Sequence, residues 1–321
     1  MLVNFETCCE LLKNGSVVAI HTETVYGLAA NALCPTAVKK IYQTKGRPAQ
    51  NPLIVHILNS ARARSLAFTN EYFFSLAEEF WPGPLTFILE SKEIVPKITT
   101  GGLNTVALRS PESDVFRNVL RKTNLPLAAP SANPTNKLSP TTAQHVLDNF
   151  KSDCPKVLDG GSCREGIEST VLDISKGNPR ILRPGPVDPH EIENHLGQKV
   201  EITHLKSNDG KSPGNSLTHY SPITPTKVFL NQTKLLAEIN SSKDQIFIFP
   251  FGKMCKSPMG PNILVISESN SREELLRNLY STLHDADKKN LAAINICLLP
   301  PTCNQYVVYN DRIKRAGTII N

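Results

Sequence analysis

A stretch rich in Ser, Pro, Gly, Asn and Thr interrupts the sequence between His204 and Thr226, and it limits the possible folds more than any other feature. It reads HLKSNDGKSPGNSLTHYSPITPT and has neither helical nor strand periodicity, so it predicts a linker. Short apolar runs alternate with helical patterns on both sides of it, which is typical of α/β folds. We therefore expect a larger α/β domain over residues 1–205, a linker over residues 206–225 and a small α/β domain over residues 226–321.

The part before the linker combines helices and strands in an irregular order. The strand-like run SVVAI (residues 16–20) follows a helical pattern that ends at a glycine, and Ser113 with Asp114 marks the start of a later helix. The strand spacing is too irregular to ensure a simple doubly wound repeat. The expected helices cover residues 5–14, 35–45, 141–150 and a stretch from 113, and the expected strands cover residues 16–20, 53–57, 85–89, 105–108, 126–129, 156–158, 169–174 and 180–182.

The part after the linker alternates more regularly. A helix begins at Ser271, where Glu274 three residues later completes a capping-box pattern. Strands that alternate with helices in so short a segment indicate a small, Rossmann-like α/β domain. The apolar runs that predict its strands are residues 227–230, 245–249, 262–266 and 294–299.

Composition and charge exclude several classes of protein. Apolar residues make up 40% of the chain, which predicts a real core, and no apolar run approaches the ~18 residues that span a bilayer. The eight cysteines include no C-x-x-C pair, so we expect neither a protein-bound metal nor a disulfide framework. No basic segment precedes an apolar stretch near the start, so we expect no secretory signal and a cytoplasmic location. The formal charge of +6 permits an anionic partner without requiring one.

The common nucleotide and hydrolase signatures are absent from the sequence. It contains no G-x-x-x-x-G-K-[ST], no G-x-G-x-x-G after a strand, no G-x-S-x-G and no H-E-x-x-H. The pair Gly101-Gly102 predicts a turn rather than a phosphate loop. The sequence therefore argues against P-loop and dinucleotide-binding folds.

Polar segments at the ends of expected strands are the first candidates for a site, because α/β folds place ligand groups there. HTETVYGL (residues 21–28) follows the first strand, Arg109 ends another, and APSAN (residues 129–133) follows a third. Arg109 has the planar fork that binds a carboxylate, while Ser131 and Asn133 are able to contact phosphate or ribose. Taken singly, these segments are equally well explained as turns.

The segment Lys45-Gly46-Arg47 is a candidate of a second kind. A point charge beside a planar fork suits a polyphosphate, although a lysine at the end of a helix is as often a complement to the helix dipole. His56 lies in an expected strand, where a lone histidine is more often a packed residue than a ligand. The remaining candidate segments are residues 168–170, 183–185 and, in the linker, 212–214 and 219–222.

Taken together, these segments resemble one family. HTETVYGLAANAL, TKGRPAQNPLIVHI, WPGPLTFIL, TVALRSP, APSAN, GIESTVLDI, ILRPG and the linker pair SPG and HYSP follow the order of the YrdC-like threonylcarbamoyl-AMP synthases. The match covers nearly all of residues 10–222, and the linker with the C-terminal domain is similar to the long form of the family. Eight motifs in one order are far more specific than any one of them.

The resemblance implies an enzyme that condenses L-threonine, bicarbonate and ATP into L-threonylcarbamoyladenylate and releases pyrophosphate. It implies a YrdC-like twisted mixed sheet with a concave basic face, and Mg²⁺ that arrives with ATP rather than on a dedicated protein site. The product would pass to the tRNA threonylcarbamoyl transferase complex, which modifies tRNA beside the anticodon, and a weak direct contact with tRNA is compatible with this scheme.

Carried over position by position, the resemblance implies two sites that lie side by side. Lys45 and Arg47 would be the catalytic charges, and the linker with Tyr220 would close as a lid. The implied L-threonine site consists of Thr24, His56, Arg109, Ala129 and Ser169. The implied ATP site consists of Arg47, Asn51, Thr105, Ser131, Asn133, Ser139, Arg183 and Tyr220.

Two alternatives stand beside this interpretation. A YrdC-like face could bind tRNA or double-stranded RNA without catalysis, although the even charge balance argues against that function. The related carbamoyl-transfer domain of hydrogenase maturation proteins occurs with zinc-finger and acylphosphatase segments, and this chain has neither the cysteine pattern nor the length for them.

Overall fold

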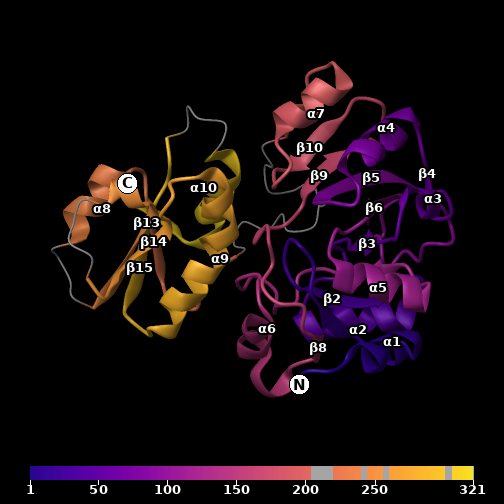
Figure 1. The fold of residues 1–321 in the computed structure, drawn as a ribbon, viewed down its shortest axis with the longest axis horizontal. Helices are drawn as coiled ribbons and strands as arrows, with labels where there is room; N and C mark the ends of the chain where they lie inside the picture. The colour runs from indigo at the N-terminus through magenta and orange to yellow at the C-terminus, as the bar shows by residue number, and fades with distance from the viewer. Residues whose placement is uncertain (204–219, 240–243, 256–259, 301–305, 321) are drawn as a thin grey trace. The chain divides into compact units, whose positions relative to one another are not determined.

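The computed structural model describes residues 1–203, 220–239, 244–255, 260–300 and 306–320, so most of the expected linker, residues 206–219, lies outside the described residues. The chain divides into two compact units (Figure 1). Two short segments from the first half of the chain, Asn136–Ser139 and Glu165–Ile167, belong to the same unit as the C-terminal part. The first unit contains Met1–Thr135, Pro140–Arg164 and Glu168–Asn215, and the second contains these two segments and Ser216–Asn321.

The first unit is built on a mixed sheet of eleven strands, which confirms the predicted mixed α/β fold. The strand order is β11-β10-β9-β5-β6-β3-β7-β2-β1-β8, and β4 pairs with β5. Parallel and antiparallel pairs adjoin: β1 is antiparallel to β2 and parallel to β8. The strands are β1 (Val18–Ile20), β2 (Gly27–Asn31), β3 (Ile54–His56), β4 (Ala67–Phe68), β5 (Leu85–Ser91), β6 (Thr105–Arg109), β7 (Leu127–Ala128), β8 (Lys156–Leu158), β9 (Thr170–Asp173), β10 (Arg180–Arg183) and β11 (Glu201–Ile202).

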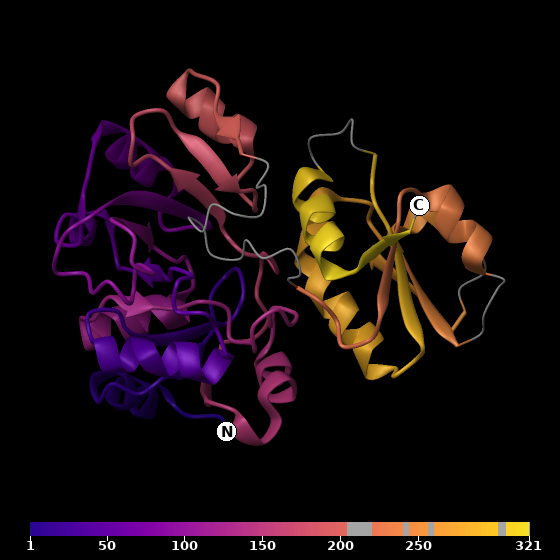
Figure 2. The ribbon, with the colours of Figure 1, turned by 180° about the vertical axis from the view of Figure 1, so that it is seen from behind.

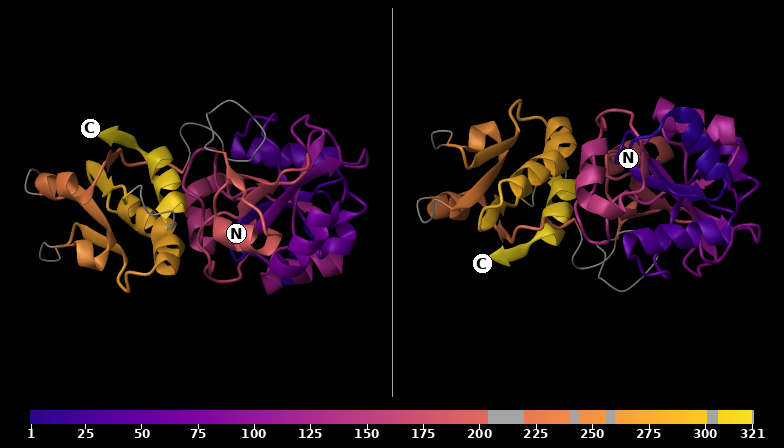
Figure 3. Two further views of the ribbon diagram at one scale, coloured as in Figure 1. Left: turned by 90° about the horizontal axis from the view of Figure 1, so that it is seen from above. Right: turned by 90° about the horizontal axis from the view of Figure 1, so that it is seen from below.

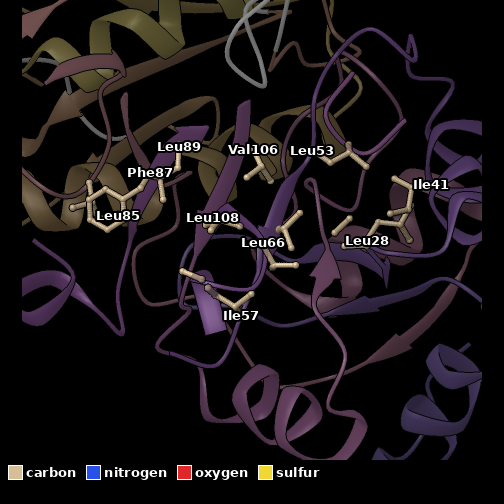
Figure 4. Close-up of a cluster of buried hydrophobic side chains, with 14 of the residues drawn as sticks. Leu28, Ile41, Leu53, Ile57, Leu66, Leu85, Phe87, Leu89, Val106 and Leu108 are labelled. Carbon is tan, nitrogen blue, oxygen red and sulfur yellow. The ribbon is translucent and has the colours of Figure 1, made fainter. Parts of the chain in front are cut away.

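Alternation along the strands sends apolar side chains to both faces of this sheet. Ala19 belongs to the main core, which includes residues of α2, α4 and α6, whereas Val18 and Ile20 pack in a smaller cluster with α1 and α5. Figure 2 shows the helices from behind, and Figure 4 shows part of the main core, where Leu28, Phe87 and Leu108 are labelled. The helices are α1 (Phe5–Lys13), α2 (Pro35–Lys45), α3 (Ser60–Ala63), α4 (Glu71–Phe80), α5 (Asp114–Thr123), α6 (Ala143–Phe150) and α7 (Pro189–Leu196).

The second unit contains a parallel sheet of five strands in the order β14-β13-β15-β12-β16. Helices cover both faces of this sheet (Figure 3), which explains why β13 reads as a continuous apolar run, QIFIFPF. Leu235 of α8 packs with Phe247 and Phe249 on one face. The elements are β12 (Thr226–Phe229), α8 (Gln232–Glu238), β13 (Gln245–Phe251), β14 (Ile263–Ser267), α9 (Arg272–Lys288), β15 (Ala293–Cys297), α10 (Val307–Ala316) and β16 (Thr318–Ile320).

Two local predictions need correction. The segment GLAAN forms β2, although its Gly, Ala and Asn residues are poor strand formers and no strand was predicted there. Its burial between neighbouring strands overrides its weak intrinsic preference. Ser271 does cap α9 by accepting a hydrogen bond from the Glu274 N–H, but the Glu274 carboxylate binds Ser267 and Ser269 instead of completing a capping box.

Candidate active site

One face of the mixed sheet in the first unit carries a buried polar pair. Residues two apart on a strand share a face, so Ile54 and His56 of β3 lie on one side of the sheet, as do Ala107 and Arg109 of β6. Ile54 and Ala107 belong to one small apolar cluster. His56 and Arg109 therefore lie on the same face of the sheet as this apolar cluster. They are paired with each other in the register of β3 and β6.

His56 is a neutral imidazole in this setting. Its side chain is 2% exposed and packs against the Phe116 ring with 5.0 Å between the ring centroids. Burial and the neighbouring Arg109 charge lower the pKa of His56 to about 3. Its Nδ1 atom has no hydrogen-bond partner among the described residues. The ring can therefore exchange a hydrogen bond with a ligand without carrying charge near pH 7.

A tight turn after β1 prepares the contacts to Arg109. Thr22 Oγ1 accepts hydrogen bonds from the N–H groups of Thr24 and Val25, each at 3.2 Å, which folds the chain back on itself. Thr22 Oγ1 also lies 2.9 Å from Thr24 Oγ1. The turn presents two consecutive side chains, Glu23 and Thr24, to the guanidinium of Arg109.

The Arg109 guanidinium is held from three sides. Nε donates to the Gly83 carbonyl at 3.2 Å, Nη1 donates to Thr24 Oγ1 at 2.9 Å, and Nη2 donates to Glu23 Oε1 at 2.5 Å. Both charged side chains of the ion pair are only 4% exposed. A guanidinium has five N–H groups, so these bonds leave two for a ligand. The motif analysis selected Arg109 and Thr24 but missed Glu23, whose only sequence signal is its place beside Thr24 in HTETV.

Ser169 lies in a second group of buried polar residues. Its hydroxyl is 2.8 Å from Thr86 Oγ1 of β5, and Arg183 Nη2 donates to both its carbonyl oxygen at 2.9 Å and its hydroxyl at 3.1 Å. Gly185 is required nearby, because a Cβ there would meet Thr170 N at 2.4 Å. The predicted threonine contact Ser169 and the predicted ATP contact Arg183 are thus brought together, and Thr86 is a member that the sequence did not reveal.

Lys45 is buried at the end of α2, where Gly46 in the left-handed region (φ 58°) stops the helix. Its Nζ donates to the carbonyl oxygens of Ser131 and Asn133, each at 2.5 Å, and lies 3.4 Å from Asn133 Oδ1. Burial and the nearby Arg47 charge lower its pKa well below the usual value. Three oxygens match the three N–H groups of the ammonium. The structure therefore places Lys45 as a clamp on the 131–133 turn.

The other predicted residues of this unit lie on strands and turns of the first unit. Arg47 donates from Nη2 to the Pro52 carbonyl at 3.2 Å, close to Asn51, and the Ala129 N–H donates to the Ile54 carbonyl at 3.0 Å. Ser131 forms a β-bridge with Gly27, and Thr105 begins β6. The 129–133 turn is thereby tied to β2, to β3 and, through Lys45, to α2.

Two predicted ATP contacts belong to the second unit. The Ser139 carbonyl accepts a hydrogen bond from His284 Nε2 at 3.1 Å. Tyr220 is 1% exposed, stacks on Tyr280 with 5.6 Å between the ring centroids, and lies under the Arg312 guanidinium at 5.1 Å. Tyr220 is therefore an anchored residue rather than an exposed one. The other linker candidates, residues 212–214 and 219, lie outside the described residues.

Within the described ranges, no group of three or more His, Cys, Asp or Glu side chains is arranged to hold a metal ion. Within the same ranges, no helix has both the length and the apolar character needed to cross a bilayer.

The fold and the site together define a mixed α/β protein whose main sheet carries buried polar side chains on one face. A family model described as Telomere recombination, which groups Sua5, YciO and YrdC, matches residues 10–185. A second model, described as Threonylcarbamoyl-AMP synthase, C-terminal domain, matches residues 187–318. The chain belongs to the threonylcarbamoyl-AMP synthase family and is an enzyme, as its motifs predict.

Known relatives match nearly the whole chain. The threonylcarbamoyl-AMP synthase of Pyrococcus abyssi is 38% identical over 296 residues, which cover 88% of this chain and 85% of the relative. That of Bacillus subtilis is 35% identical over 316 residues, covering 96% and 91%. The crystal structure of P. abyssi Sua5 complexed with L-threonine matches with a TM-score of 0.89 and 33% identity over all of both chains. These comparisons lend no support to an RNA-binding module without catalysis.

Proposed function

We propose that this chain makes L-threonylcarbamoyladenylate from L-threonine, bicarbonate and ATP and releases pyrophosphate. The observation that carries the proposal is the group formed by Arg109, Thr24 and His56 on one sheet face. A buried guanidinium with two N–H groups to spare suits a carboxylate, and a neutral imidazole with an unpartnered nitrogen suits a hydroxyl. L-threonine carries both groups, and the relative of known structure is described as a complex with it.

The chemistry of this reaction calls for positioning and charge rather than for a covalent nucleophile. The threonine ammonium first gives a proton to solvent, and the free amine then attacks the bicarbonate carbon as water leaves. A carbamate oxygen then attacks the α-phosphorus of ATP and pyrophosphate leaves. Both partners of the second step are anionic, so cations that neutralise and orient them lower the barrier. In our proposal Arg109 holds the threonine carboxylate, with Thr24 and Gly83 fixing the plane of its guanidinium.

On the nucleotide side, we assign the ATP phosphates and ribose to the turn that Lys45 holds and to the residues around it. Lys45 then acts as a positioning residue, because its ammonium is already bonded to Ser131 and Asn133. The proposed nucleotide contacts in the first unit are Arg47, Asn51, Thr105, Ser131, Asn133 and Arg183. The resemblance also assigns Ser139 and Tyr220, which belong to the second unit. The residues found near the turn offer hydroxyl, amide and cationic groups, which fits Mg²⁺ carried by the phosphates, where it would neutralise their charge.

The wider role of the reaction is part of the same proposal. A carbamoyl adenylate is a mixed anhydride that water destroys, so in our proposal the enzyme works in the cytoplasm and passes its product directly to a transferase acting on tRNA.

Pyrophosphate release provides the test. The protein is incubated with ATP, bicarbonate and L-threonine, and then with each of the three omitted in turn. We expect pyrophosphate only from the complete mixture, with L-serine a poorer substitute for L-threonine. Equal turnover with alanine or glycine would show that the assigned threonine pocket is wrong, and RNA binding without pyrophosphate release would favour the RNA-binding alternative.

A further inference from the structure

Glu23 is a buried carboxylate that the proposed reaction does not yet use. One of its oxygens, Oε1, pairs with Arg109 Nη2 at 2.5 Å. The other, Oε2, is buried and makes no hydrogen bond within the described part of the chain. An unpaired carboxylate oxygen in the interior is costly, because it has lost its water without gaining a donor. Such an atom points to a missing ligand that supplies a donor.

Glu23 is ionised in spite of its burial. Burial alone would raise the pKa of this carboxyl, but the Arg109 charge and its hydrogen bond, together with nearby backbone N–H groups, bring the net pKa below its usual value. The group is therefore a fixed negative charge and a poor base near pH 7. A fixed buried anion is suited to holding a cation in place rather than to taking a proton from it.

The polar atoms left unpaired around Arg109 include hydrogen-bond donors, an imidazole nitrogen and an anionic acceptor. Arg109 retains two N–H donors, His56 retains Nδ1, and Glu23 retains the anionic acceptor Oε2. The charges of Glu23 and Arg109 both act on the pKa of His56, so the three groups lie within electrostatic reach of one another. The set matches a ligand with a carboxylate, a hydroxyl and an ammonium.

We infer that Glu23 Oε2 accepts a hydrogen bond from the ammonium group of the bound amino acid, so that Glu23 and Arg109 together form a receptor for a zwitterion. The inference rests on the proposed function, since it assigns a further contact to the same substrate. Each charged end of the amino acid meets its opposite in a low-dielectric site, where such hydrogen bonds are strong.

This arrangement also gives the reaction a direction. Once the ammonium has given a proton to solvent, its nitrogen attacks bicarbonate, water leaves, and the cationic group of the substrate has become an anionic carbamate. Glu23 attracts the first and repels the second, so the carbamate is driven away from Glu23 while Arg109 keeps its hold on the carboxylate. The carbamate oxygen is thereby freed for attack on the nucleotide.

A ligand series tests the contact directly. Binding of L-threonine and of (R)-3-hydroxybutanoate, which is threonine without its amino group, is measured by calorimetry on the wild-type protein and on Glu23→Gln. We expect the wild type to lose affinity by about 30-fold or more when the amino group is removed, and Glu23→Gln to lose less than about threefold. Glu112→Gln is the matched control, since the Glu112 side chain pairs with the exposed Arg164, and it should behave as the wild type does.

The outcomes separate this inference from the function on which it rests. Equal losses in the wild type and in Glu23→Gln overturn the ammonium contact while leaving threonine binding in place. If Glu23→Gln does not fold, the wild type alone decides, because similar affinities for the two ligands also overturn the contact. A wild type that binds no threonine and releases no pyrophosphate removes the proposed function, and this inference with it.

Discussion

Two of the buried cations of the first unit, Arg109 and Lys45, are satisfied in opposite ways. Arg109 has a carboxylate partner, Glu23, and keeps two N–H groups unused. The Lys45 ammonium makes its hydrogen bonds to three neutral oxygens, one for each of its N–H groups. Burial lowers the pKa of Lys45, whereas the charge of Arg109 is neutralised by its ion pair with Glu23.

The difference shows how a buried charge can serve either a ligand or the fold. A compensated cation with spare donors can take up and release a second anion without leaving an unpaired charge behind. A cation saturated by backbone carbonyls fixes the turn that carries them, and its removal leaves several acceptors unpaired. Arg109 is therefore suited to substrate exchange, and Lys45 to holding the 131–133 turn in one conformation.

The largest effect is expected for Arg109→Gln. It removes the carboxylate clamp and leaves Glu23 as an uncompensated buried charge, so pyrophosphate release should fall by about a thousandfold or more and the free energy of unfolding by ~3–5 kcal/mol. ATP binding, measured by calorimetry, should change little. Arg164→Gln removes the guanidinium of an ion pair whose Arg164 side chain is 57% exposed, and it should leave both quantities nearly unchanged.

Lys45→Met tests the other half of the comparison. We expect turnover to fall by the equivalent of ~2–4 kcal/mol in activation free energy, with a higher KM for ATP and threonine affinity preserved. The exposed Lys288→Ala is the control and should retain full turnover. If Lys45→Met lost turnover but kept the wild-type unfolding free energy, Lys45 would contact the phosphates rather than hold the turn.

The stability of the protein should depend on pH through His56. Its pKa lies near 3 in the folded protein and near 6.5 when unfolded, so the unfolded chain binds the extra proton first as pH falls. The contribution is complete above pH 6.5 and is lost below it, by ~2 kcal/mol between pH 6.5 and pH 5. Urea unfolding at both pH values should show this loss in the wild type and in the exposed-site control His190→Gln, but not in His56→Gln. If all three proteins lost the same unfolding free energy between pH 6.5 and pH 5, His56 would be accessible to protons in the folded state.

The smallest effect is expected for Thr24→Val, which removes one acceptor from the Arg109 guanidinium without changing the side-chain shape. The KM for threonine should rise about tenfold with kcat nearly constant, because the clamp is loosened rather than lost. Thr36→Val on the exposed side of α2 should leave the KM unchanged. A fall in kcat without a change in KM would place Thr24 in the chemical step instead.

Sequence reasoning identified the two cations but not what satisfies them. Arg109 was found because it ends an apolar strand, where α/β folds place ligand groups, and Lys45 because it ends a helix at a glycine. The Glu23–Arg109 pair joins residues 86 positions apart. It depends on the turn at Thr22, and no local sequence pattern predicts that turn. Lys45 reaches its carbonyls across a similar separation, so its role in the turn could not be predicted either.

Whole strands are also predictable only when their own sequence carries the signal. The apolar run at residues 245–249 was predicted as a strand, and β13, which extends to Phe251, confirms it. The strand β2 was missed because GLAAN carries no strand preference of its own. Its conformation comes from the neighbours that bury it, and these are known only once the chain is folded.

The membership of residues 136–139 in the second unit bears on how this protein can be divided or recombined. Leu138 and Ser139 are almost fully buried, the Asn136 carbonyl accepts a hydrogen bond from the Ser221 N–H, and the Ser139 carbonyl binds His284. A gene fragment that ends near residue 205 would carry this loop away from its partners, only a few residues after the turn that Lys45 holds. Exchange of C-terminal parts between relatives should therefore succeed only when residues 136–139 and 165–167 are exchanged with them. The structural unit includes residues that a single cut in the sequence would leave behind.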